Sequence, residues 1–248
     1  MTRNSRSSGA PAVPTNGILG ALLRTEYRRL LAKMEHVELA CGTVLYRAGQ
    51  GIEYVYFPED AVVAMVDTME DSRTVEVGTI GCEGMTGINI FLGGLSTPDK
   101  AVVQLSGGAL RMKSRDLRKE ITFGSPLQRA LLQYTQALLA VISQLVACSQ
   151  HHSVEQRLAR WLLTMHDYAR SHAFEMPHES IAAMLGVRRA GVSTAAAGLR
   201  DGGLIRYQRR RVAVLDPRTL ERKSCECYRF IRKQYRSLRI RVPRLLSA

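Results

Sequence analysis

The chain has 248 residues, enough for two modest domains, with 35 Lys and Arg residues against 22 Asp and Glu residues. Its five cysteines are odd in number and the first thirty residues lack the apolar core of a signal peptide, so we expect a reduced, cytoplasmic protein rather than a disulfide-stabilised secreted one. No run of eighteen apolar residues occurs, which argues against a membrane-spanning helix.

The positive charge is unevenly distributed along the chain. From residue 175 to the C-terminus there are 17 basic and 6 acidic residues, whereas residues 37–124 hold 8 basic and 12 acidic residues. A basic domain joined to a mildly acidic one is typical of a protein that binds a polyanion and carries a separate control or assembly module.

The N-terminal half predicts a small β domain. Residues 1–17 are rich in Ser, Asn, Gly and Pro and are expected to form a disordered tail, followed by a short helix over residues 19–34. From residue 37 to 110, short apolar runs are broken by turn residues every 8 to 12 positions or so, which predicts an antiparallel roll or barrel. Another short helix is expected over residues 114–120.

A long helix is predicted from Ser125 to Gln150, because Ser can cap a helix and Pro126 suits its first turn. Apolar residues then alternate at spacings of four and three, which is typical of a helix that pairs with a partner, although a helix buried in a monomer core remains the alternative. A second apolar stripe flanks this seam, so one stripe can pack on the roll while the other meets a partner across a two-fold axis. The dimer interface is assigned to Leu127, Leu131, Tyr134, Leu138, Val141 and Leu145, with Cys148 ending the seam, and the flanking stripe is Ala130, Leu132, Leu139, Ile142 and Val146.

An amphipathic helix is predicted next, within "VEQRLARWLLTMHDYAR". Two adjacent histidines, His151 and His152, precede it. Neighbouring residues on a helix or turn point apart, so this pair alone does not predict a metal site.

Residues 177–200 have the pattern of a helix-turn-helix. Pro177 to Leu185 predicts a short helix, and Gly186 permits the left-handed backbone that ends it. A second helix is predicted from Arg189 to Arg200. Its buried side is expected to consist of Val192, Ala196 and Leu199.

The second helix suits the major groove of DNA, where its N-terminal end and outer face would meet the bases and phosphates. Arg189 is the candidate for a bidentate contact to guanine. Arginines at a helix N-terminus oppose the helix dipole unless an anion lies there, which favours a DNA contact over simple solvation. Small outward-facing residues, including Ala190 and Ala197, would let the backbone approach the duplex closely.

After Gly202 and Gly203, "LIRYQRRRVAVLD" predicts two short strands joined by a basic turn, which forms a wing. Arginines on such a turn would bind backbone phosphates and add affinity without sequence information. The residues assigned to DNA binding in the helix and the wing are Arg188, Arg189, Ala190, Ser193, Thr194, Arg200, Arg209, Arg210 and Arg211.

In order and length, residues 20–220 or so resemble the CRP/FNR superfamily of bacterial transcription regulators. The resemblance rests most on "ESIAAMLGVRRAGVSTAAAGL", with Arg189 at the position of the family's base-reading arginine. Ala190 stands where many members carry a glutamate, so the target site is expected to differ from the best-known one. The resemblance implies an α+β protein: a tail (1–17), a cyclic-nucleotide-binding-like jelly-roll sensor of the double-stranded β-helix type (18–124), a dimerisation helix (125–152) and a winged helix-turn-helix domain with a basic C-terminal helix (153–248).

The resemblance also implies a cytoplasmic homodimer that binds an inverted repeat in double-stranded DNA, contacts RNA polymerase and activates or represses transcription. In members that bind a cyclic nucleotide, a Gly-Glu pair holds the ribose and a later Arg-Ser/Thr-Ala holds the phosphate. This chain offers Glu83 and, in the second position, Asp99, Lys100 and Ala101. An aspartate there would repel a phosphate, so no cyclic nucleotide and no other cofactor is predicted, and Glu83 and Lys100 remain candidate pocket residues for another ligand.

The cysteines do not match the clustered N-terminal set that an FNR-type iron–sulfur sensor needs. Cys225 and Cys227 lie in "ERKSCECYRFIRKQYRSLRIR", which predicts a C-terminal helix. Residues two apart on a helix point about 200° from each other, so joint metal binding would require an unwound turn. Core packing of the stripe Cys225, Tyr228, Ile231, Tyr235 and Leu238 is the favoured interpretation, and a redox- or metal-responsive pair is the alternative.

No sequence motif indicates an enzyme, since a Walker loop, a zinc-protease motif and a nucleophile elbow are all missing. Dispersed Cys and His residues could still assemble in space. A second alternative is non-specific binding of nucleic acid or of an anionic membrane through the basic tail, residues 229–244.

Overall fold

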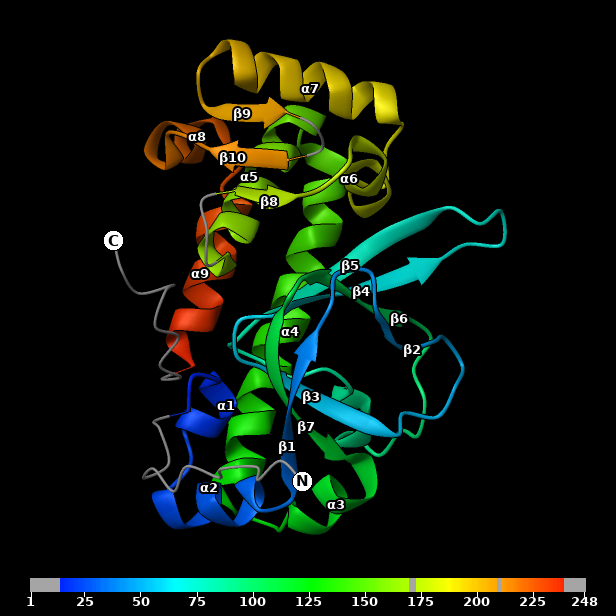
Figure 1. Cartoon of the computed structure of the whole chain (residues 1–248), viewed down its shortest axis with the longest axis vertical. Coiled ribbons are helices and arrows are strands. Elements are labelled where there is room, and N and C mark those ends of the chain that lie inside the picture. Colours follow the sequence, from blue (N-terminus) through cyan, green and yellow to red (C-terminus); the bar gives the residue numbers. More distant parts are fainter. Residues whose placement is uncertain (1–13, 170–172, 209–210, 239–248) are drawn as a thin grey trace, which may run out of the picture.

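The computed structural model describes residues 14–169, 173–208 and 211–238 of the chain. A β domain of two antiparallel sheets lies at one end, and a small helical domain with its own three-stranded sheet lies at the other (Figure 1). The long helix α4 (Pro126–His151) runs between them. The α+β fold predicted from the sequence is confirmed.

The β domain is a roll of two antiparallel sheets, with strand orders β1–β7–β3 and β2–β6–β4–β5. Every pairing within them is antiparallel. The chain therefore crosses repeatedly from one sheet to the other. The strands are β1 (Met34–Leu39), β2 (Val44–Tyr46), β3 (Tyr54–Pro58), β4 (Val62–Thr68), β5 (Thr74–Ile80), β6 (Lys100–Leu105) and β7 (Gly107–Lys113), with a 3-10 turn η1 at Ile88–Ile90.

The roll is closed by α4 as well as by its own sheets. Five successive residues of β4, from Val62 to Val66, are buried, so both faces of this strand are covered. On β5, a Cβ atom placed on Gly78 would lie only 4.0 Å from the Leu138 side chain of α4. The apolar face of α4 is therefore part of the same core.

The single helix predicted over residues 19–34 is wrong. Two short helices occupy this region, α1 (Gly17–Gly20) and α2 (Arg24–Leu31), and Met34 already belongs to β1. Leu23 between them has an extended backbone (φ −63°, ψ 145°), and Gly20 is a poor helix former. The helix predicted over residues 114–120 is present as α3 (Ser114–Glu120).

Helix α4 begins and ends close to its predicted bounds. Ser125 caps it by accepting a hydrogen bond from the Gln128 backbone N–H (3.1 Å), and Pro126 occupies the first turn. Of the described helices, α4 alone is long and apolar enough to cross a membrane. One such helix is a weak indication, since the core helix of a soluble protein meets the same criterion.

Five of the six residues assigned to the dimer interface are buried inside the protomer, so the assignment is wrong for them, and the sixth, Leu145, is half-buried. Leu127, Leu131 and Tyr134 are fully inaccessible because they pack on the roll and on neighbouring helices, and Leu138 and Val141 are nearly so. Most of the flanking stripe faces outward instead, although its member Ala130 is buried and Ile142 is half-buried. Its members Leu132, Leu139 and Val146 are 53%, 60% and 62% exposed.

The C-terminal domain is the predicted helix-turn-helix with two wing strands. Helix α5 (Val154–Tyr168) starts with a capping box, in which Ser153 and Gln156 satisfy each other's backbone N–H groups. A small antiparallel sheet in the order β8–β10–β9 supports the helices. The remaining elements are β8 (Ala173–Glu175), α6 (His178–Leu185), α7 (Arg189–Asp201), β9 (Ile205–Gln208), β10 (Arg211–Val214), α8 (Pro217–Lys223) and α9 (Cys227–Ser237).

The C-terminal segment does not form one continuous helix. It is broken at residues 224–226, where the Ser224 hydroxyl hydrogen-bonds the Glu221 carbonyl and competes with the helical pattern. Cys225 therefore lies in a turn and Cys227 begins α9, which runs beside α4 (Figure 1). The predicted core packing is confirmed for Tyr228, Ile231, Tyr235 and Leu238, whereas Cys225 is buried in a separate cluster with Cys148 and Cys227.

Candidate nucleic-acid interface

The turn between α6 and α7 depends on Gly186, which ends α6 in the left-handed region (φ 63°). Any residue other than glycine would have a strained backbone there, and its Cβ atom would also approach Val75 of β5 to 3.2 Å. Arg188 is the extended N-cap residue of α7 and supplies no side-chain cap. The first turn of α7 thus leaves its backbone N–H groups without a capping side chain, as a phosphate-binding helix end would.

The inner face of α7 explains the small size of its residues. Val192, Ala195, Ala196 and Leu199 are buried, as predicted for three of them. A Cβ atom on Gly198 would approach the Glu155 carboxylate of α5 to 3.1 Å. Small residues are therefore needed where α7 rests on α5, in addition to any role toward DNA.

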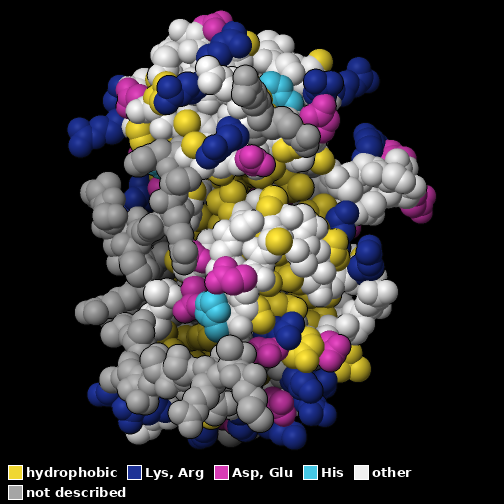
Figure 2. Space-filling model, viewed as in Figure 1, with side chains coloured by type: hydrophobic (Ala, Val, Ile, Leu, Met, Phe, Trp, Pro, Cys, Tyr) yellow, Lys and Arg dark blue, Asp and Glu magenta, His cyan; other side chains and the backbone are white. Residues whose placement is uncertain are grey.

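The outer face of α7 is open to solvent. Arg188, Arg189, Ala190, Thr194 and Arg200 are all exposed. In Figure 1 this helix lies at the outer end of the molecule, away from the roll. Figure 2 shows Lys and Arg side chains over that end of the molecule, and others at the opposite end. Nothing in the described part of the chain covers the proposed reading surface.

Arg189 and Ser193 have partners on α6. The Arg189 Nε atom lies 3.0 Å from Glu179 Oε1, and both side chains are more than 60% exposed. Such an exposed pair is weak, so the guanidinium can leave it for a stronger partner. The half-buried Ser193 hydroxyl contacts His178 Nδ1 at 3.1 Å. The structure therefore brings the recognition residues together with Glu179 and His178, which the sequence did not single out.

The wing consists of β9 and β10, paired antiparallel with Arg211 opposite Gln208. Arg211 is exposed, as a phosphate contact requires. Arg209 and Arg210 lie outside the described residues. Arg206 on β9 is also exposed and adds a basic side chain that the sequence analysis did not assign.

A groove of about 1140 Å³ lies where the roll meets the helix-turn-helix. The end of the β4–β5 hairpin forms one wall, and the α6–α7 turn forms the other. Arg73, Arg157, Arg188 and Arg189 contribute to its lining together with Glu179, so positive charge predominates in it. The β4–β5 hairpin of the roll thus contacts the α6–α7 turn, and the roll does not cover the outer face of α7.

The candidate ligand residues of the roll do not form an accessible site in this structure. Glu83 follows β5 and is completely buried, and its carboxylate accepts a hydrogen bond from the Gly81 N–H (2.9 Å). Burial raises the pKa of Glu83 to about 7, although hydrogen bonds from Gly81 and Tyr168 act in the opposite direction. Lys100 is half-buried at the start of β6, and neighbouring Asp99 is buried and bonded to the Thr97 hydroxyl.

The loop that carries Glu83 instead connects the roll to the helices. A Cβ atom on Gly81 would lie 2.3 Å from the Tyr168 ring of α5, and one on Gly84 would lie 2.4 Å from the Tyr134 ring of α4. Only glycine fits at such distances. The loop is therefore packed against both the long helix and the DNA-binding domain, a junction that no sequence pattern indicated.

Comparison with known families supports the C-terminal assignment. The family model described as a Crp-like helix-turn-helix domain matches residues 156–223. This segment contains α6, α7 and both wing strands. No curated protein matches the sequence at a significant level.

Solved structures with the same architecture cover most of the chain. FixK2 from Bradyrhizobium japonicum superposes with a TM-score of 0.66 at 18% identity, covering 77% of this chain and 98% of that one. A CRP-family transcriptional regulator from Thermus thermophilus, TTHB099, gives 0.62 at 23% identity, covering 76% and 96%. The c-di-GMP responsive regulator CLP from Xanthomonas campestris gives 0.60 at 17% identity, covering 77% and 99%.

Both findings agree with the resemblance seen in the sequence. The family match identifies the domain that holds the exposed arginine-tipped helix, and the superpositions extend the shared fold to the roll and the long helix. Residues 156–223 therefore match a Crp-like helix-turn-helix domain, and the chain shares the fold of these solved regulators.

Proposed function

We propose that the protein is a homodimeric transcription regulator that binds an inverted repeat in double-stranded DNA with α7 in the major groove. The observation that carries this proposal is the exposed outer face of α7, which presents two arginines at its N-terminal end within a Crp-like helix-turn-helix domain. A helix of this kind places its N-terminal residues against base edges.

Each exposed residue of the interface has a role in this proposal. Arg189 leaves Glu179 and makes a bidentate contact to guanine O6 and N7. Arg188, Ser193, Thr194 and Arg200 contact phosphates or neighbouring bases, and Ala190 allows close approach. The wing arginines Arg209, Arg210 and Arg211 bind backbone phosphates.

The dimer forms through the exposed stripe of α4. Leu132, Leu139 and Val146 are seven residues apart and recur on one face, as the seam of a paired helix requires. Along its 26 residues α4 is about 39 Å long, and a parallel pair of these helices would carry both DNA-binding domains at the same end of the dimer.

The remaining assignments follow the same scheme. Residues 18–124 act as the sensor, 125–152 as the dimerisation helix and 153–248 as the DNA-binding domain, after a tail at 1–17. Because Glu83 is buried, a cyclic nucleotide is not the proposed signal. The protein works in the cytoplasm, without a catalytic activity of its own, and acts on transcription through RNA polymerase.

The experiment starts from full-length protein and a random duplex library. Selected sites are compared with random duplex by competition at about 150 mM salt, where a specific regulator prefers its site at least about a thousandfold. Arg189→Lys keeps the charge but loses the planar fork, so discrimination at one base pair of each half-site falls by about 1–3 kcal/mol. Arg115→Ala removes an exposed arginine from α3 of the roll and serves as the control, with unchanged specificity.

Two outcomes contradict the proposal. Equal affinity for selected and random duplex, with a steep salt dependence, would make the protein a charge-driven polyanion binder. A specificity that Arg189→Lys and Arg115→Ala alter to the same extent would remove Arg189 from the reading surface.

A further inference from the structure

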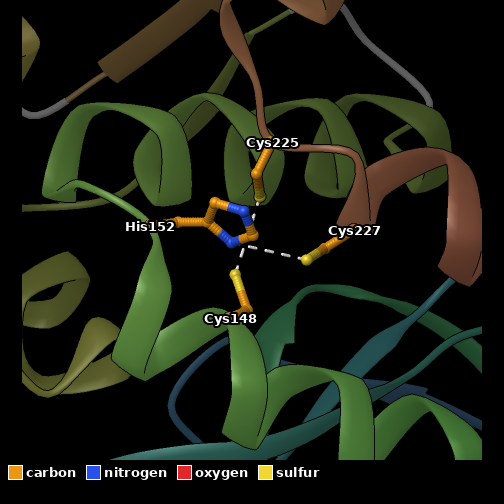
Figure 3. A group of neighbouring side chains, drawn as sticks. All are labelled: Cys148, His152, Cys225 and Cys227. Atoms are coloured by element: carbon orange, nitrogen blue, oxygen red, sulfur yellow. Dashed lines mark hydrogen bonds between the residues drawn. The ribbon is translucent and has the colours of Figure 1, made fainter.

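Four potential metal ligands from two distant parts of the chain meet at the junction of α4, α5 and α9. Cys148 and His152 come from the last turn of α4 and its C-cap, and Cys225 and Cys227 come from the α8–α9 turn and the start of α9. Figure 3 shows the four side chains pointing toward one another. Their ligand atoms all lie within 4.8 Å of one another.

The backbone explains why the four side chains can converge. Cys148 and His152 are four residues apart, so they lie on the same side of the helix end. Cys225 is not helical, because α8 ends before it, whereas Cys227 is the first residue of α9. The broken helix removes the 200° divergence that would otherwise separate these two thiols.

The distances match a tetrahedral metal site. Zinc bonds of about 2.3 Å to sulfur and about 2.0–2.1 Å to nitrogen place two sulfur ligands about 3.8 Å apart and a sulfur and a nitrogen about 3.6 Å apart. In the structure, the Sγ atoms of Cys148 and Cys225 are 3.6 Å apart, and Cys227 Sγ is 3.6 Å from His152 Nδ1. These two pairs therefore already have the spacing of ligands in one coordination sphere, and all four ligand atoms lie within 4.8 Å of one another.

The groups around the cluster orient its ligands. His152 Nε2 lies 3.1 Å from the Glu226 carboxylate, which leaves Nδ1 facing the thiols. A carboxylate on the outer nitrogen of a metal-bound histidine is a common supporting contact. The Gln144 amide also donates a hydrogen bond to Cys227 Sγ (3.1 Å), as it would to a thiolate.

The charge balance of the junction also favours a metal. Three thiolates, a neutral histidine and a divalent ion carry one net negative charge. Arg160 is 93% buried by its own chain (7% exposed), and its Nε atom has no hydrogen-bond partner among the described residues. Its guanidinium interacts electrostatically with Cys148 and Cys225. A buried arginine needs such a counter-charge.

We propose that Cys148, His152, Cys225 and Cys227 bind one Zn²⁺ ion in a closed tetrahedral site. With four protein ligands, no position is left for water or substrate, which is typical of a structural zinc rather than a catalytic one. The ion joins the end of α4 to the start of α9, at the point where the long helix leads into the DNA-binding domain. It thereby fixes the C-terminal helix to the rest of the protein.

Two other chemistries account for fewer of these features. A two-iron cluster divides its ligands between two metal ions, whereas these four ligand atoms all lie within 4.8 Å of one another. A disulfide between Cys148 and Cys225 would leave Cys227 and His152 without a role. A zinc site accounts for all four ligands and provides the counter-charge for the buried Arg160.

The test measures metal directly and does not depend on DNA binding, so it is separate from the proposed function. Full-length protein purified without chelators should contain one zinc per chain by plasma mass spectrometry. The double variant Cys225→Ser/Cys227→Ser should lose this zinc. The control Cys41→Ser/Cys82→Ser changes two cysteines outside the cluster and should retain it.

A second readout avoids any effect of the substitutions on folding. Wild-type protein that has been reduced and stripped of metal should take up one equivalent of Co²⁺ and show thiolate-to-cobalt charge transfer and the visible bands of a tetrahedral ion. Added Zn²⁺ should abolish these bands at one equivalent. Removing zinc should also lower the Tm of the wild type and of the Cys41/Cys82 control.

Three results would overturn the proposal. The first is reduced wild-type protein that binds neither Co²⁺ nor Zn²⁺. The second is iron with acid-labile sulfide in place of zinc. The third is a chain two mass units lighter than its sequence that, after reduction, takes up no metal, which would indicate a redox-active Cys148–Cys225 pair.

Discussion

Glu83 is a buried carboxyl group between the roll and the helical domain, and its replacement by Gln should stabilise the protein at neutral pH. The unfolded chain has a pKa of 4.5 at this position, and burial raises the folded value to about 7. Since one pKa unit corresponds to about 1.4 kcal/mol, ionised Glu83 costs the folded state about 3 kcal/mol.

The direction of the pH dependence of the free energy of unfolding follows from proton binding. Between pH 4.5 and about 7 the folded protein holds a proton on Glu83 that the unfolded chain has released, so the free energy of unfolding decreases as pH rises. Above pH 7 Glu83 is ionised in both states, so its contribution to the free energy of unfolding no longer changes with pH. The stabilisation by Glu83→Gln should therefore be near zero at pH 4.5, increase by about 1.4 kcal/mol per pH unit, and level off at about 3 kcal/mol.

Urea unfolding at a series of pH values measures this difference, with Glu70→Gln on the exposed end of the β4–β5 hairpin as the control. The control should show no such slope. A Glu83→Gln protein whose stability differs from wild type by the same amount at pH 5 and pH 8 would refute the burial argument.

Gly84→Ala should destabilise the protein by about 1–3 kcal/mol in the same unfolding assay, because the new methyl group would meet the Tyr134 ring, whereas Gly51→Ala, with open space around it, should have little effect. Ser153→Ala removes the capping box of α5 and should cost about 1 kcal/mol; an unchanged stability would mean that the cap is unimportant here. Leu139→Glu places like charges across the proposed α4 seam and should give monomers by sedimentation, and a variant that remains dimeric at micromolar concentration would contradict that seam.

The helix-turn-helix was predictable because its signals are local. Gly186 ends one helix through its own backbone freedom, and the apolar residues of α7 recur at helical spacing. The roll was predictable for a similar reason, since its turn residues interrupt short apolar runs. In these elements, each residue's preference agrees with its tertiary environment.

The partner of each face of α4 was not predictable. Leu138 and Leu139 are adjacent in sequence and equally apolar, but one packs on the roll and the other faces solvent. Heptad spacing shows that a stripe is buried against something. It does not show whether the partner is the same chain or a second copy.

The cysteine cluster was missed because it depends on a helix break and on contacts across the chain. Cys148 and Cys225 are 77 residues apart, and a continuous helix would have directed Cys225 and Cys227 to different sides. The local hydrogen bonds of Ser224 interrupt that helix. The serine before a Cys-Glu-Cys sequence is a signal that could have suggested the break.

The central claim is that α7 reads DNA in the major groove, and methylation interference on a selected site tests it most directly. Methylation of guanine N7 blocks the acceptor that Arg189 is proposed to contact. The claim predicts interference at guanines in two successive major grooves, about one helical turn apart, and its loss at those guanines with Arg189→Ala, which removes the donor. Strong binding that is insensitive to N7 methylation throughout the site would contradict it.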